Sequence, residues 1–91
     1  MPKVYLVVIG RSGNDVIGCA LAEDGEPLGS HLSSSEGWLK ADLESEHHQE
    51  AYKEHYPNGY EMEFVSKPKE HEGYQKALKL NHEKYPLPPE Q

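Results

Sequence analysis

The stretch Val4-Tyr5-Leu6-Val7-Val8-Ile9 decides the fold of this chain. It is apolar on both of its alternating faces and rich in β-branched residues, which is typical of a strand that is covered on both sides or paired centrally. The run is also far shorter than the roughly 20 apolar residues that a helix needs to cross a bilayer. The segment therefore predicts a strand in the middle of a sheet.

Two more strands follow from the turn residues downstream. Residues 10–15 are rich in turn formers, and a pattern compatible with a strand resumes over 16–22. The dipeptide Asp24-Gly25 then favours a tight hairpin, because glycine tolerates the positive φ that such turns demand. We expect the third strand over 28–32, beginning at a sheet edge, because Pro27 cannot donate a ladder hydrogen bond.

A helical region is expected after the third strand. Ser33 and Glu36 have the spacing of a capping box, which predicts a helix start. Ser45 is a second candidate cap, so the stretch 36–56 is predicted to form either two helices or one kinked helix. Both alternatives stay open at the level of pattern.

The rest of the chain completes an α+β fold. Residues 60–64 alternate apolar with acidic side chains, as a half-buried strand does, and 70–85 has apolar residues at helical spacing. We expect a small, mainly antiparallel sheet of about four strands with two or three helices packed on one face. Residues 1–85 are predicted to form the single domain, and the proline-rich residues 86–91 an extended, mobile C-terminal tail.

Composition excludes several classes of function. The chain of 91 residues has 16 acidic and 9 basic residues and a formal net charge of −7. This balance argues against direct binding to nucleic acid and against attachment to an anionic membrane surface. The single cysteine, Cys19, cannot form an internal disulfide, and no signal-peptide pattern is present, so we expect a cytoplasmic location.

The acidity is concentrated in residues 36–63. This part has eight acids and two bases, a balance of −6 out of the total of −7. Carboxylates are almost never buried unpaired, so these side chains should face solvent. They form either an ordinary solvated surface or one that attracts and docks a basic partner. The residues expected to bind such a partner are Glu44, Glu46, Glu50 and Glu54 for charge, with Tyr52 as an anchor.

Histidines are the other unusual feature. Three of the six, His47, His48 and His55, fall within nine positions. On a straight helix His48 and His55 would be about 10 Å apart along the axis, too far for one zinc ion with bonds near ~2.1 Å. These three are therefore weak metal-ligand candidates, and a site would have to recruit His31, His71 or His82.

The sequence thus favours a non-catalytic module for protein interaction or regulation, with no cofactor and no predicted catalytic residue. Its partner would be a protein with a basic patch or a second copy of the chain, as in a homodimer. One alternative is a nucleic-acid mimic that inhibits a DNA- or RNA-binding protein, for which a charge of −7 is modest. The other is a histidine-based metal-binding protein or metal-dependent enzyme.

Overall fold

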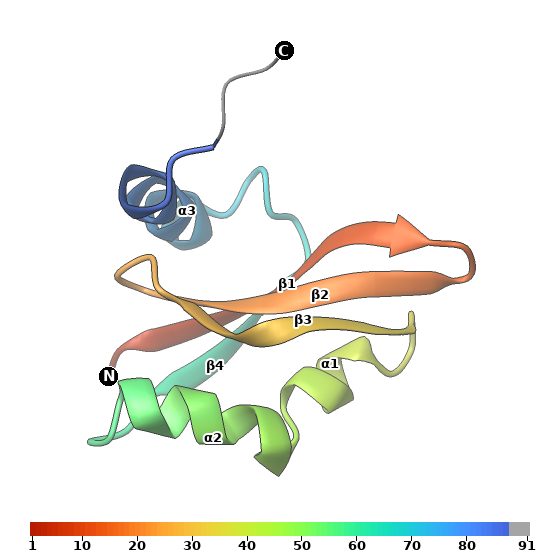
Figure 1. The fold of residues 1–91 in the computed structure, drawn as a ribbon, viewed down its shortest axis with the longest axis horizontal. Helices are drawn as coiled ribbons and strands as arrows, with labels where there is room; N and C mark the ends of the chain where they lie inside the picture. Colours follow the sequence, from red (N-terminus) through yellow and green to blue (C-terminus); the bar gives the residue numbers. More distant parts are fainter. Residues whose placement is uncertain (88–91) are drawn as a thin grey trace.

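The computed structural model describes residues 1–87 and has the predicted α+β fold (Figure 1). Four strands form one mixed, mostly antiparallel sheet, and three helices pack against it. The elements in chain order are β1 (Lys3–Ser12), β2 (Asp15–Ala22), β3 (Pro27–Ser35), α1 (Leu39–Leu43), α2 (Glu46–His55), β4 (Glu61–Val65) and α3 (Glu72–Lys84). Residues 88–91 of the predicted tail lie outside the described part of the chain.

The strand predicted from residues 4–9 is central, as expected. The strand order is β3-β2-β1-β4, and β1 pairs antiparallel with β2 and parallel with β4. Val4 to Val7 are buried without interruption, so both faces of β1 are covered. The half-buried strand predicted over 60–64 is β4, in which Met62 and Phe64 pack against the core while Glu61 is exposed.

The helices lie on both faces of the sheet, which corrects the expectation that they pack on one. On one face, Val4 and Leu6 join a cluster with residues of α1 and α2, including Tyr52. On the other face, Tyr5 and Val7 join a second cluster with Tyr74 and Ala77 of α3. Figure 1 shows α3 on the opposite side of the sheet from α1 and α2. The physical reason is the twofold period of a strand, because an apolar run on both faces of β1 needs cover on both.

The helix start predicted at Ser33 and Glu36 is wrong. Residues 33–35 belong to β3, where they pair with Ile17, Val16 and Asp15 of β2. The region 36–56 then forms two separate helices, α1 and α2. Ser45 is the N-cap of α2 and has extended backbone angles (φ −64°, ψ 154°), which break the helical path after α1.

The predicted hairpin at Asp24-Gly25 is the turn between β2 and β3, and α3 packs directly on it. Gly25 has a φ of +92°, in the region that glycine favours. A Cβ placed on Gly25 would lie 2.6 Å from the Asn81 backbone nitrogen and 2.8 Å from the Leu80 carbonyl carbon. Glycine is therefore required here both for the turn and for the approach of α3.

Replacing Gly25 with alanine should lower the free energy of unfolding more than the same change at Gly13. Both glycines have positive φ, where a side chain costs roughly 1–2 kcal/mol. A Cβ at Gly13 meets no atom within 4 Å, whereas at Gly25 the clash with the α3 backbone adds about 1–3 kcal/mol. Urea unfolding of Gly25→Ala and Gly13→Ala measures the difference, and equal losses would contradict the close packing of α3 on this turn.

Candidate functional site

Helix α2 presents three exposed carboxylates along one side. Glu46, Glu50 and Glu54 are spaced four residues apart, so they share a helix face at steps of about 6 Å. None of the three forms an ion pair with any residue between 1 and 87. Like charges at this spacing weaken a helix by about 0.2–0.5 kcal/mol per pair. We call Glu46, Glu50 and Glu54 the α2 acidic stripe.

Tyr52 does not belong to this surface, so its predicted role as a partner anchor is wrong. It is two residues beyond Glu50, which places it on the opposite side of the helix, and it is 1% exposed. Its hydroxyl donates a hydrogen bond to the Leu43 carbonyl at 2.9 Å, and burial raises its pKa. Tyr52 instead fixes α2 to the sheet and to the end of α1.

Glu44 is also separate from the stripe. It is the C-cap of α1, and its carboxylate lies 3.6 Å from the Lys40 ammonium group. Its backbone carbonyl accepts a hydrogen bond from Gln49 Nε2 at 2.6 Å. The four predicted acidic residues thus divide into three on α2 and one that serves the junction between the two helices.

The three clustered histidines have different neighbours. His47 is exposed, with its ring edge-to-face against His48 at a centroid distance of 5.5 Å. The Nδ1 atom of His48 lies 3.1 Å from the Ser45 hydroxyl, and His55 contacts the β2–β3 turn. Within residues 1–87, no three His, Cys, Asp or Glu side chains are grouped so that they could hold a metal ion.

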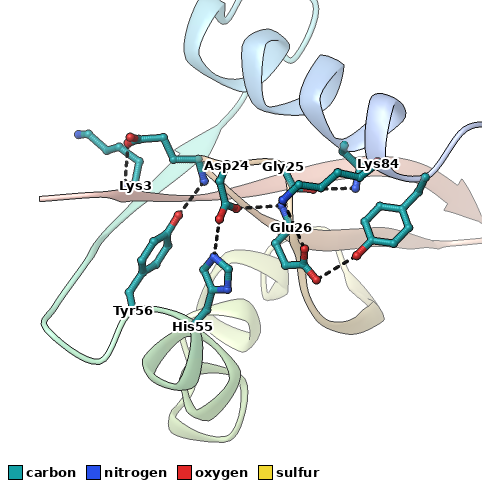
Figure 2. Close-up of polar contacts among 10 residues, drawn as sticks. Lys3, Asp24, Gly25, Glu26, His55, Tyr56 and Lys84 are labelled. Atoms are coloured by element: carbon teal, nitrogen blue, oxygen red, sulfur yellow. Dashed lines mark hydrogen bonds and ion pairs between the residues drawn. The ribbon is translucent and has the colours of Figure 1, made fainter.

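The β2–β3 turn, residues 23–26, connects the C-terminal ends of α2 and α3 (Figure 2). From α2, His55 Nε2 donates to the Asp24 carboxylate at 3.0 Å. From α3, Asn81 Nδ2 donates to the Gly25 carbonyl at 2.8 Å. The other contacts are Glu23 N–H donating to the Tyr56 hydroxyl at 3.2 Å, Tyr85 hydroxyl donating to Glu26 at 3.0 Å, and Lys84 Nζ lying 3.7 Å from Glu26. We call this set of contacts the turn junction.

The turn junction stabilises the ionised form of Asp24. Partial burial alone would raise the pKa of this carboxyl, but the Glu26 amide and His55 outweigh burial and lower the pKa overall. Sequence reasoning missed the pair because Asp24 and His55 are 31 positions apart. The only local signal was the Asp-Gly dipeptide, which indicates a turn and says nothing of a distant histidine.

No family model matches the chain, and comparison with curated proteins and with solved structures found no significant match. Within the described residues, no helix is long and apolar enough to cross a bilayer. The class that the structure itself defines is an α+β domain with a four-stranded mixed sheet between two helical layers. Function must therefore be inferred from the surfaces of this fold.

Asp24→Asn should lower the free energy of unfolding near neutral pH but not in acid. The folded state lowers the Asp24 pKa, so the ionised carboxylate makes its full contribution to the free energy of unfolding above the pKa of the unfolded chain, about 3.9. This contribution is lost as the pH falls through the lower pKa of the folded state. We expect a loss below about 1 kcal/mol, because the Asp24 side chain is 50% exposed.

Urea unfolding between pH 3 and pH 7 measures this effect. Asp15→Asn, which removes an exposed carboxylate at the first residue of β2, is the control. A difference between Asp24→Asn and the parent protein that persists unchanged at pH 3 would contradict the role of the ionised carboxylate.

Proposed function

We propose that this protein is a non-catalytic interaction or regulatory module of the cytoplasm that binds the basic patch of a protein partner through the α2 acidic stripe. The observation that carries the proposal is the line of Glu46, Glu50 and Glu54, exposed and without an ion pair among residues 1–87. The cytoplasmic setting rests on the single free cysteine, which needs no oxidising compartment.

The stripe is held on a rigid support, which favours binding. Tyr52 and Ala51 pack the inner side of α2 against the sheet, and Tyr60 donates to Gln49 at 2.7 Å. The carboxylates therefore start from a fixed backbone, and only their own side chains lose freedom when a partner docks. A partner with lysine or arginine at matching spacing would also relieve the repulsion between neighbouring glutamates.

A second copy of the chain is the other candidate partner. Residues 66–87, which include α3 on the opposite side of the sheet, contain five lysines and three glutamates. A stripe from one copy facing this basic segment of the next would give a head-to-tail contact. Such self-association would use the same glutamates and would fall with salt in the same way.

Glu50→Lys should weaken partner binding about tenfold at low salt, whereas Glu83→Lys should not weaken it. Both variants replace an exposed helical glutamate and change the net charge equally, but Glu83 is on α3. Parent and variant proteins would be immobilised, and the proteins that each captures from nuclease-treated lysate would be compared at low and high salt. Each captured protein would then be titrated against the parent and the variants to measure its affinity. Sedimentation of each purified variant tests self-association.

Three results would contradict the proposal. The first is a partner that the double variant Glu46→Lys, Glu50→Lys retains as well as the parent protein does. The second is binding that does not change with salt, and the third is a loss of binding with Glu83→Lys equal to that with Glu50→Lys. Competition by DNA or RNA for a captured partner would identify the nucleic-acid mimic instead.

A further inference from the structure

Helix α3 covers only part of its side of the sheet. It lies over the end near the β2–β3 turn, and the β1–β2 hairpin extends beyond it (Figure 1). Two hollows of about 500 and 630 Å³ flank the line where α3 meets the sheet, and both are lined by Ile9, Tyr74 and Leu78. These volumes fall within the roughly 300–1,000 Å³ typical of small-molecule sites. We call the two hollows together the α3 groove.

The floor of the α3 groove is apolar. Ile9 is 45% exposed there although it is a large hydrophobic residue within a strand. Cys19 and Leu21 of β2 continue this floor. Burial raises the pKa of the Cys19 thiol to about 11, so it is protonated at neutral pH and behaves as a small apolar group.

Tyr74 provides a polar group that has no hydrogen-bond partner in the described part of the chain. It is 6% exposed, and its hydroxyl makes no hydrogen bond with the side chains or backbone of residues 1–87. Every side-chain polar atom of residues 1–87 that has no hydrogen-bond partner is in contact with solvent. The Tyr74 hydroxyl must therefore be accessible, and we infer that solvent reaches it through the groove that Tyr74 lines. Burial and the nearby Cys19 raise the Tyr74 pKa, which keeps the hydroxyl as a neutral donor. A group in this position gains from a ligand acceptor.

The rim of the groove has a positive balance, in contrast to the chain as a whole. Among the described residues, Lys67 and Lys69 line one hollow, where the single acid is Glu70, 3.7 Å from Lys67. The titratable side chains of residues 1–87 that line the other hollow are Cys19, His31 and Tyr74. Two lysines against one glutamate leave a charge of +1, which matches one negative charge on a ligand.

From these observations we infer that the α3 groove binds a small amphipathic carboxylate. The apolar body of the ligand lies over Ile9 and Leu78, which line both hollows. Its carboxylate accepts hydrogen bonds from the Tyr74 hydroxyl and the Lys69 ammonium group. This site is on the opposite side of the sheet from the α2 acidic stripe and does not depend on it.

Titration with decanoate below its micelle concentration tests the inference, by calorimetry and by amide chemical shifts of the labelled protein. We expect saturable binding with shifts concentrated in β1, β2 and α3. The cationic analogue decyltrimethylammonium should bind at least tenfold more weakly, because it has the charge of the rim.

Two variants test the assigned contacts. Tyr74→Phe keeps the ring and its packing but removes the donor, and it should weaken decanoate binding about threefold to tenfold. Lys69→Glu should weaken it at least tenfold, whereas Lys53→Glu, an equal charge change on α2, should have little effect. Thermal unfolding of each variant shows that the fold is kept.

Three results would overturn the inference. The first is no saturable decanoate binding by the folded parent protein. The second is equal binding of the anionic and cationic probes, which would indicate adsorption to apolar surface alone. The third is binding that neither Tyr74→Phe nor Lys69→Glu weakens.

Discussion

The burial of β1 on both faces is the constraint on which the rest of the structure depends. A strand with consecutive apolar residues exposes hydrophobic surface on two sides, and each side gains about 25 cal/mol per Å² when it is covered. Within residues 1–87, α1 and α2 cover one side and α3 alone covers the other. A single helix is too narrow to cover that side completely, so Ile9 stays partly exposed and the α3 groove remains open.

The β2–β3 turn makes the two helical layers one unit. Its backbone at Gly25 contacts α3 so closely that no side chain fits between them, while its Asp24 carboxylate holds the end of α2 through His55. A four-residue turn thus reaches elements on both sides of the sheet (Figure 2). Because most of its contacts are hydrogen bonds at exposed positions, each is worth about 1 kcal/mol or less, and their effect comes from acting together.

Sequence patterns predicted the elements whose signals are local. Each of these signals lies within a few residues of the element that it predicts. They are the two-sided apolar run of β1, the alternation in β4, the Asp-Gly hairpin and the helical spacing in α3. The capping signal at Ser33 failed because β3 runs on as far as Ser35, where residues 33–35 continue the ladder of hydrogen bonds with β2, the preceding strand of the hairpin. The burial of Tyr52 and the pairing of Asp24 with His55 also depend on tertiary contacts. The acidic stripe was predictable from the sequence, and the helix break at Ser45 was needed to separate Glu44 from it.

The two surfaces proposed for binding differ because the sheet separates two kinds of interaction. The α2 acidic stripe would act through charge on an exposed helix, where attraction is screened beyond about 8–10 Å at ordinary ionic strength. The α3 groove combines an apolar floor with one hydroxyl and a small positive balance, so much of its binding energy would come from removing apolar surface from water. Added salt would therefore weaken attraction to the stripe strongly, while the apolar part of the proposed groove binding would persist. Salt dependence thus distinguishes the two proposed binding surfaces within one molecule. One is a charged surface of the layer formed by α1 and α2, and the other is a mainly apolar groove beside α3 on the opposite side of β1.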